Sequence, residues 1–511
     1  MSAAGKPFAL LRWLPAAAGA AYVVTVVALG RGLVDALNWD TDASAPLALA
    51  ERLRGSGIVS IPHYGEWTSL WWLLATRGLP WHAQLWGASG YALALMAAAL
   101  VGWATSRVCG RWAGLTAAVV AVAVGPYALR SLLSLALHVT NPFGAAVLAA
   151  GVVLLPRMRS WLVALGIGAL AGVNAASDPL LWIAGLIPFA IAAAYLAWTT
   201  RRVETAVRAG TTVVAAATSA FATNVVMHEL GFRVIGLSVQ LAPVHDLPAN
   251  VRHLGRMLAL VGGANYALPG GGYPREPLRA LIALLAFAGI AAPVLAAAKF
   301  ARRRAAPIVR AYACYWGAAT VALCVIFVIT RNAAALGPNS ANYLLTLPLA
   351  AGAGVALLAA GSRRAQYAVA VAAAVVASVN IAGLAGGRAN LASTPLRTNL
   401  HALVKLLQRN NATRGYAGYW DAQNLSWQSG MRLLVSPVVR CGEALCPNSF
   451  FSIRSWYEGH DGRSFLLVDP TNGVIDKPPP FVAEARSTHH FGLLTLYVFD
   501  YDIARHIRLE S

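Results

Sequence analysis

Charged side chains are scarce in this chain: Asp, Glu, Lys and Arg together make up only 12% of its 511 residues. An ordinary soluble domain carries about 25%, so the composition argues against a typical water-soluble enzyme. Hydrophobic residues make up 58% of the chain. Apolar runs at 14–33, 280–298 and 311–329 each approach the about 20 residues that a helix needs to cross a hydrocarbon core. The sequence therefore predicts an all-α polytopic membrane protein.

Cysteine is also scarce. The five cysteines are too few for a disulfide framework, and only Cys441 and Cys446 share a polar segment. We expect these two to form a disulfide if the segment lies in an oxidising compartment. The sequence contains no CxxC pair or His cluster that would indicate a zinc site. The short basic loops contain no nucleotide-binding glycine motif, which argues against direct use of ATP or NAD.

Acidic residues are few, 20 against 40 Lys and Arg, and the charges are segregated. Runs of suitable length predict about eleven spans. They start near Leu14, Leu85, Ala113, Phe143, Trp161, Leu180, Ala209, Leu278, Ala311, Tyr343 and Ala368. The short loops on one side are basic, and Glu204 is the only acid among them. The positive-inside rule makes that side cytoplasmic. We therefore expect a multi-pass protein of the inner (cytoplasmic) membrane, with its N-terminus in the cytoplasm and its C-terminus outside.

This topology divides the chain into a membrane domain, 1–389, and an extracytoplasmic domain, 390–511. The membrane domain has a first outer loop at 35–83, with helices expected at the membrane interface. A glycine-rich outer loop follows at 228–277, either mobile over a substrate site or an inert connector. In the tail, a helix at 396–408 and strands at 432–439, 464–468 and 493–499 predict a small α+β domain.

Two carboxylates, Asp40 and Asp42, follow the first predicted span directly. Carboxylates beside a membrane surface are costly to desolvate, which makes them candidates for base catalysis or metal binding. In a strand they would point to opposite faces, and in a helical turn they would diverge by roughly 200°. Only one should therefore face a given reacting atom. The alternative is that these acids cap a helix over 45–54.

The sequence around these acids carries a family resemblance. Asn-Trp-Asp-Thr-Asp at 38–42 is followed by Pro-His-Tyr-Gly-Glu-Trp at 62–67 and by a Trp-rich stretch at 69–72. This layout resembles the GT-C superfamily of membrane glycosyltransferases, which includes protein O-mannosyltransferases and the lipid A aminoarabinose transferase. The resemblance implies an acid in the first outer loop as catalytic base and a sugar on polyprenyl phosphate as donor. It also implies an inverting displacement onto an envelope glycan, lipid or protein.

Many members of that superfamily have adjacent acids, whereas Thr41 separates the pair here. We favour Asp40 as the base. Asp42 is then a metal ligand, a group that positions the acceptor, or a cap. A divalent metal is the one cofactor left open. One base suffices because the lipid phosphate departs without a general acid, but the phosphate needs positive charge, best supplied by Arg.

Several outer arginines could supply that charge: Arg77, Arg130, Arg233, Arg252, Arg256, Arg275 and Arg331. Arg331 is favoured as a substrate-binding residue because it ends a span and precedes the polar stretch that contains Asn339 and Tyr343. Related transferases often carry an Arg-Tyr pair at a comparable helix entrance, and here Asn342 replaces that Arg. Arg331 could compensate, or it could simply anchor the helix at the interface.

Other outer polar residues are weaker candidates for substrate binding: His63, Tyr64, Glu66 and Asp178. Asp178 could instead cap a helix that begins at Pro179, and His138 is expected in a surface loop. Tyr419-Trp420-Asp421 is similar to the Trp-Trp-Asp motif of oligosaccharyltransferases, although aromatic residues in the tail are more simply explained as core.

The predicted partners are a polyprenyl-phosphate sugar, an acceptor and membrane lipid, and no nucleic acid. Two other functions compete with a glycosyltransferase. A lipid or sugar transporter usually places ionisable residues near the bilayer midplane and has repeated halves. The nearly uncharged spans and the lack of paired halves argue against it. A noncatalytic envelope scaffold would leave the acidic first loop unexplained.

Overall fold

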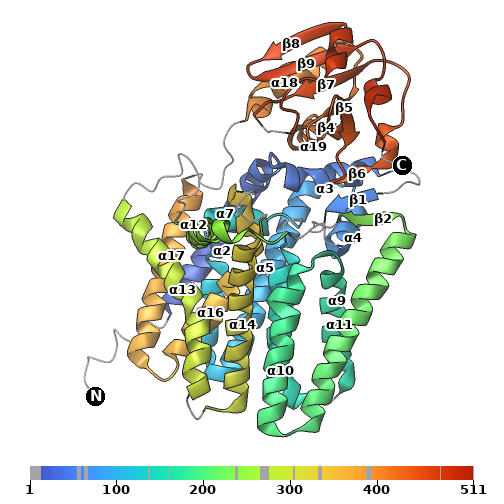
Figure 1. Ribbon diagram of the computed structural model, residues 1–511. Helices are drawn as coiled ribbons and strands as arrows, with labels where there is room; N and C mark the ends of the chain where they lie inside the picture. The colour runs from blue at the N-terminus through green and yellow to red at the C-terminus, as the bar shows by residue number, and fades with distance from the viewer. Residues whose placement is uncertain are drawn as a thin grey trace.

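A computed structural model describes residues 13–53, 59–62, 67–135, 138–158, 160–235, 240–264, 276–302, 305–331, 337–386, 394–471 and 474–509. The molecule consists of a long bundle of helices with a smaller mixed α and β unit at one end (Figure 1). That unit is called the C-terminal unit below and comprises 394–471 and 474–509.

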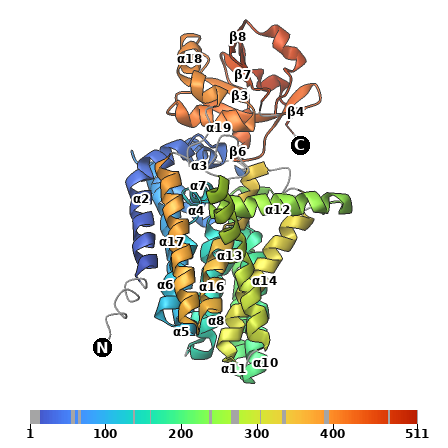
Figure 2. The ribbon, with the colours of Figure 1, turned by 90° about the vertical axis from the view of Figure 1, so that its left-hand side faces the viewer.

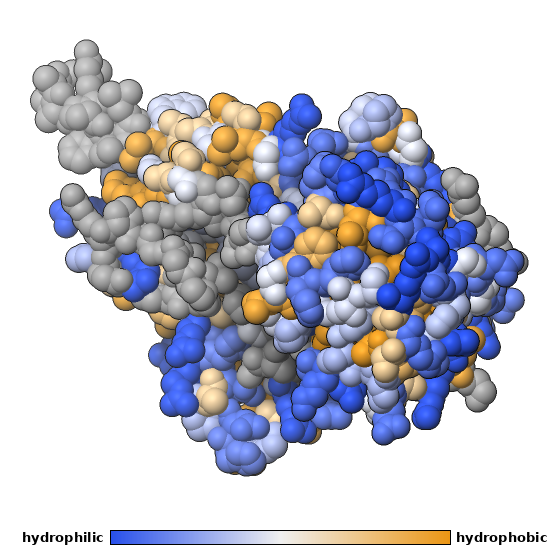
Figure 3. Space-filling view, turned by 90° about the horizontal axis from the view of Figure 1, so that it is seen from above, coloured by the Kyte–Doolittle hydropathy of each residue, from blue (hydrophilic) through white to orange (hydrophobic). Residues whose placement is uncertain are grey.

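Among the described residues, seven helical stretches are long and apolar enough to cross a membrane. They are α2 (Leu14–Leu37), α5 (His82–Cys109), the stretch Trp182–Thr200 formed by η3 (Trp182–Leu186) and α10 (Ile187–Thr200), α11 (Val203–Glu229), α13 (Glu276–Arg302), α14 (Pro307–Ile329) and α17 (Arg363–Ala385). The bundle exposes large apolar side chains such as Trp198, Phe221 and Leu284. The surface at the other end of the molecule, where the chain's C-terminal residues lie, is instead largely hydrophilic (Figure 3). The chain is thus an integral membrane protein.

An eighth stretch is bent by 88° between α6 (Arg111–Val122) and α7 (Pro126–Leu132). Gly125 lies at the bend. Its N–H donates to the Val261 carbonyl at 2.9 Å, and a Cβ added there would lie 2.5 Å from the backbone of Gly263. A larger residue would not allow this close approach, so the glycine fixes the place where the helix breaks.

Shorter helices account for the other predicted spans. These are α8 (Thr140–Leu154, continued by η2, Leu155–Arg157), α9 (Trp161–Ser177) and α16 (Leu347–Ala359). Helices thus lie near every predicted start, but length and composition support seven or eight spans in the described chain. The total of about eleven stays a prediction. The basic turn between α10 and α11 lies at the end of the bundle remote from the C-terminal unit (Figure 1).

The predicted outer loops contain regular structure. The first contains α3 (Thr41–Arg52), β1 (Val59–Pro62) and α4 (Trp67–Thr76). Helix α3 begins at Thr41, earlier than the predicted 45. The second loop contains β2 (Phe232–Ile235), η4 (Val244–Asp246) and α12 (Leu247–Gly262). Helix α12 lies across the bundle (Figure 2). The described part of this loop is therefore structured, whereas 236–239 and 265–275, which include the glycines at 270–272, lie outside the described residues.

The C-terminal unit is built on a six-stranded mixed sheet of order β5-β4-β3-β7-β9-β8. Its elements are α18 (Pro395–Arg409), β3 (Arg414–Ala417), α19 (Tyr419–Gln428), β4 (Leu434–Cys441), β5 (Ala444–Pro447), β6 (Ser452–Ile453), η6 (Arg454–Tyr457), β7 (Ser464–Val468), η7 (Pro480–Glu484), β8 (Ser487–Phe491), β9 (Leu494–Phe499) and η8 (Ile503–His506). Strand β7 lies inside the sheet and is buried at every position. The predicted helix and all three predicted strands are confirmed, each to within two residues at either end.

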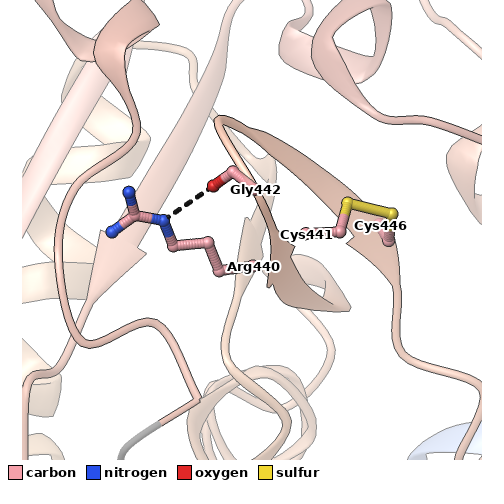
Figure 4. The surroundings of a disulfide bond; sticks show 4 residues. All are labelled: Arg440, Cys441, Gly442 and Cys446. Atoms are coloured by element: carbon pink, nitrogen blue, oxygen red, sulfur yellow. Dashed lines mark hydrogen bonds between the residues drawn. A yellow bond between two sulfur atoms is a disulfide. The ribbon is translucent and has the colours of Figure 1, made fainter.

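The predicted disulfide between Cys441 and Cys446 is also present. It joins β4 and β5 across their hairpin, where Arg440 Nε donates to the Gly442 carbonyl at 3.0 Å (Figure 4). Cys109, Cys314 and Cys324 are free and half-buried.

Several contacts attach the C-terminal unit to the rest of the chain. A second sheet, of order β2-β1-β6, joins three segments that are far apart in the sequence. In addition, α19 packs on α3 through the Asn424 amide. This side chain accepts from Ser44 Oγ at 2.7 Å and donates to Thr41 Oγ1 at 2.9 Å and to the Trp39 carbonyl at 3.0 Å. The C-terminal unit is thereby held against α3, in the predicted first outer loop.

We expect Asn424→Ala to loosen this contact, because each buried group left without a partner costs about 1–3 kcal/mol. Hydrogen exchange of the amides in α3 and α19 should become faster. The matched control is Asn410→Ala, because the Asn410 amide bonds only the Leu406 carbonyl within its own helix, at 3.0 Å. Equal exchange in both variants would show that the Asn424 contacts do not hold the two parts together.

Candidate active site

Asp40 has two roles in the structure. It is the N-cap of α3, where Oδ1 accepts from the Asp42 N–H at 3.1 Å. The capping interpretation is therefore correct for this residue, although the helix starts earlier than predicted. The other oxygen, Oδ2, accepts from Arg130 Nη2 at 2.8 Å. Because a carboxylate has two oxygens, capping the helix leaves Asp40 able to face a second group.

Arg130 lies on α7, just beyond the helix break, and is 9% exposed. Its guanidinium carbon lies 5.0 Å from the centre of the Tyr127 ring. Its buried Nε has no hydrogen-bond partner among the described residues. A guanidinium pairs best with anions in a bidentate manner. This side chain therefore holds Asp40 with one nitrogen and retains a donor for another anion.

The predicted arginine, Arg331, is not the one that pairs with the acids. It lies exposed at the end of α14, where its N–H donates to the Gln240 carbonyl at 3.0 Å. Arg130 is one of the outer arginines of the sequence, but no local pattern distinguishes it from the others. Only the bend before α7 brings it to the start of α3.

Asp42 is buried in the first turn of α3 and faces a different partner. Tyr419 Oη donates to its Oδ1 at 2.8 Å. The two acids thus bond to different elements, Asp40 to α7 and Asp42 to α19, as their expected divergence predicts. Tyr419 belongs to the Tyr-Trp-Asp stretch, whose aromatic residues are expected from the sequence to lie in a hydrophobic core. It is buried, but it also completes this site.

The 3-10 segment η5 (Gly337–Leu344) lies next to α7. Tyr127 Oη donates to Asn339 Oδ1 at 2.7 Å, and Ser131 Oγ donates to Asn342 Oδ1. The predicted residue Asn339 is therefore linked to Asp40 by three successive contacts, through Tyr127 and Arg130.

Asp178 is fully buried, and its oxygens have separate roles. Oδ1 accepts from the Leu180 N–H at 3.0 Å, which is the predicted cap. Oδ2 accepts from Asn141 Nδ2 at 2.6 Å and is hydrogen-bonded to His138 Nδ1 at 2.5 Å. The prediction that His138 lies in a surface loop is wrong. It is buried with φ 59°, because a buried carboxylate provides its partner.

Tyr343 links this pair to the acids of the first loop. Its ring centre lies 4.6 Å from that of His138. Burial raises the pKa of Tyr343, and the negative charges of Asp178 and Asp42 raise it further. Of the predicted site residues, Asp40, Asp42, Asp178, Asn339 and Tyr343 are thus brought to one region.

The remaining predicted residues His63, Tyr64 and Glu66 lie outside the described residues. In the part of the chain that the structure describes, no group of three or more His, Cys, Asp and Glu side chains is placed to hold a metal ion.

An apolar cavity of about 520 Å³ opens beside the helix break. It lies between α6, α12, α13, α16 and α17, and its lining is almost entirely aliphatic. Val124 and Gly262, which line it, flank the contact between Gly125 and Gly263. The cavity therefore reaches the residues that directly precede α7, the helix that carries Arg130.

No family model matches the chain, and no curated protein matches its sequence. Solved structures do resemble it. ArnT from Cupriavidus metallidurans bound to undecaprenyl phosphate superposes with a TM-score of 0.53 at 13% identity, covering 93% of this chain and 98% of ArnT. The Archaeoglobus fulgidus oligosaccharyltransferase gives a TM-score of 0.47 at 14% identity, covering 83% of this chain and 62% of that enzyme. The likeness to ArnT shows that this chain shares the fold of that protein.

Proposed function

We propose that this protein is a GT-C-type glycosyltransferase that moves a sugar from a polyprenyl-phosphate donor to an acceptor outside the cytoplasmic membrane. The observation that carries the proposal is the ion pair between Asp40 and the buried Arg130, beside an apolar cavity. ArnT, which has the same fold, has been crystallised with undecaprenyl phosphate.

The donor site follows from Arg130 and the cavity. The aliphatic lining accepts the part of the polyprenyl chain nearest to the phosphate, because burial of hydrocarbon is favourable and needs no specific contacts. Arg130 Nε, a buried donor without a partner among the described residues, then binds a phosphate oxygen. This arrangement places the sugar at the outer end of α7, next to the start of α3.

The transfer needs one base. The acceptor hydroxyl oxygen attacks the anomeric carbon of the donor, the bond from that carbon to the phosphate oxygen breaks, and the phosphate leaves with the electron pair. Asp40 takes the hydroxyl proton, and the configuration at the carbon inverts. Arg130 holds Asp40 in place and offsets the charge that develops on the leaving phosphate. Asp42, fixed by Tyr419, positions the acceptor.

The acceptor in this proposal is an envelope glycan, lipid or protein. A divalent metal remains an open part of the proposal, and no step above depends on one. His63, Tyr64, Glu66, Asp178, Asn339 and Tyr343 are proposed to line the substrate site. Arg331 is not retained, because its exposed position at the end of α14 leaves the phosphate to Arg130.

Asp40→Asn should lower the rate of transfer by about 10²–10⁴-fold, the usual contribution of a general base. The amide keeps an oxygen that can cap α3, so the fold should survive. The measurement is single-turnover transfer from a polyprenyl-phosphate sugar, with Asp42→Asn as the matched control. A large loss in Asp42→Asn alone would move the base to Asp42, and full activity in both variants would refute the mechanism.

Arg130→Lys tests the donor site. Lysine keeps the charge beside Asp40 but cannot offer a second nitrogen in the same plane. We expect the donor KM to rise about tenfold, as for the loss of one charge-assisted hydrogen bond, with a smaller change in kcat. Arg77→Lys is the control, because Arg77 is exposed and donates only to the Leu53 carbonyl, at 3.1 Å. Equal effects in the two variants would remove Arg130 from the donor site.

The orientation is part of the proposal, with the N-terminus in the cytoplasm and the C-terminal unit outside. Alkaline phosphatase fused after Ser511 should be active in a bacterial host, because the enzyme folds only in the oxidising compartment where a disulfide such as Cys441–Cys446 forms. Fluorescence from a green fluorescent protein fused at the same point, with an inactive phosphatase fusion, would reverse the orientation.

A further inference from the structure

A second cavity, of about 510 Å³, lies between the C-terminal end of α3 and the C-terminal unit. Unlike the cavity beside α7, it is polar. Its lining includes Arg52, Arg414, Tyr416, Trp456, Glu458 and His460. It contains none of the residues assigned above to donor binding or to proton transfer.

Arg52 is fixed on one side of this cavity. Its Nη1 donates to the Val435 carbonyl at 2.7 Å, and its guanidinium carbon lies 3.6 Å from the centre of the Trp456 ring. Burial lowers the pKa of Arg52 to about 9. No carboxylate among the described residues lies within ion-pair distance of it, and its guanidinium donates instead to the Val435 carbonyl and to Ser436 Oγ.

Arg414 is exposed at the start of β3, and its side chain makes no hydrogen bond or ion pair with the described residues. Its neighbour Tyr416 donates to Asp502 Oδ1 at 3.2 Å, and His460 Nδ1 lies 2.5 Å from Asp502 Oδ2. One carboxylate thus orients both of these rings. The cavity therefore has a rigid wall and one cation free to bind a ligand.

The charges that line this cavity nearly cancel, since Arg52 and Arg414 are matched by Glu51 and Glu458. Such a lining does not select a multiply charged anion, and it is too polar for a hydrocarbon chain. It offers donors, acceptors and aromatic side chains in one place. Sugar hydroxyls both donate and accept, and a sugar ring has an apolar face that packs on aromatic rings. The chemistry of the lining therefore fits a carbohydrate.

The position of the cavity relates it to the candidate active site. Asp40 caps the first turn of α3, and Arg52 ends the same helix. At 1.5 Å per residue the helix places the two ends about 17 Å apart. We infer that this cavity holds sugar residues of a carbohydrate acceptor several units away from the hydroxyl that reacts at Asp40. The inference rests on the proposed function and narrows its acceptor to a glycan chain.

The first test is direct binding, which needs no turnover. The full chain in lipid nanodiscs is titrated with linear neutral mannan, galactan, arabinan and glucan oligosaccharides, and binding is followed by saturation-transfer NMR and calorimetry. Arg414→Ala should weaken binding of the best oligosaccharide about tenfold, as for loss of a hydrogen bond to a charged group. Glu458→Gln is the second variant, and Arg409→Ala is the control, because Arg409 is exposed and lies outside the cavity lining.

Binding should be unchanged in Asp40→Asn, which separates this site from the reaction. If wild-type protein binds an oligosaccharide and Arg414→Ala weakens that binding, but no acceptor is glycosylated, the cavity assignment stands and the proposed function fails. If no oligosaccharide binds, or if Arg414→Ala and Arg409→Ala bind equally, the inference is overturned. Binding of inorganic phosphate in place of the oligosaccharides would also overturn it, in favour of an anion site.

Where an acceptor is found, its length provides a second test. Arg414→Ala and Glu458→Gln should lower kcat/KM for long acceptors toward the value for short acceptors. The kcat/KM for short acceptors should not change. An equal loss for acceptors of every length would assign Arg414 to folding or to the reaction instead of to this cavity.

Discussion

The break between α6 and α7 is the constraint on which the site depends. A helix in a bilayer cannot be interrupted unless its freed backbone groups find partners inside the protein. Here three other helices provide them. The Asn380 amide donates to the Ala123 carbonyl at 2.9 Å, Tyr22 Oη donates to the Val124 carbonyl at 2.8 Å, and the Val261 carbonyl accepts from Gly125. With these groups satisfied, α7 can turn by 88° and bring Arg130 to Asp40.

The same break separates two environments. On its inner side, Val124 lines an aliphatic cavity, and on its outer side Tyr127 and Arg130 contact polar groups of η5 and α3. A lipid phosphate has this same division into a hydrocarbon chain and an anion. This correspondence supports a lipid-linked donor more directly than the overall fold does. A noncatalytic scaffold would have no need for a buried arginine with an unused donor beside an acid.

The C-terminal unit contributes to the site as well as resting on it. Tyr419 fixes Asp42. Asn424 holds the two residues next to Asp40, through the Trp39 carbonyl on one side and the Thr41 hydroxyl on the other. Farther along α3, strand β4 and Trp456 hold Arg52. Helix α3 is therefore clamped at both ends by one unit. Its acids and the polar cavity consequently keep a fixed separation, which is what selection of a long acceptor requires.

The sequence alone determined the features that depend on local patterns. Apolar runs located the helices, a short apolar run between turn signals located the strand Ser464–Val468, and spacing identified the disulfide between Cys441 and Cys446. The position of Asp40 after the first span made it a candidate site residue, which stays a prediction, and its role as a helix cap was the alternative that the structure bears out. The helices and the strand could be predicted because hydrogen bonding within a helix, and the length and composition of an apolar run, depend on neighbours in the chain.

Only the tertiary structure decided which partners these residues have. Arg130 lies ninety positions from Asp40 in the sequence, and Tyr419 lies 377 positions from Asp42. Nothing local distinguishes Arg130 from the exposed Arg331, or a surface His138 from one buried on Asp178. A local pattern shows which face of a helix is apolar, but a charge is buried only where the fold supplies partners for it. That pairing is set by the helix break and by the docking of the C-terminal unit, both of which are long-range contacts.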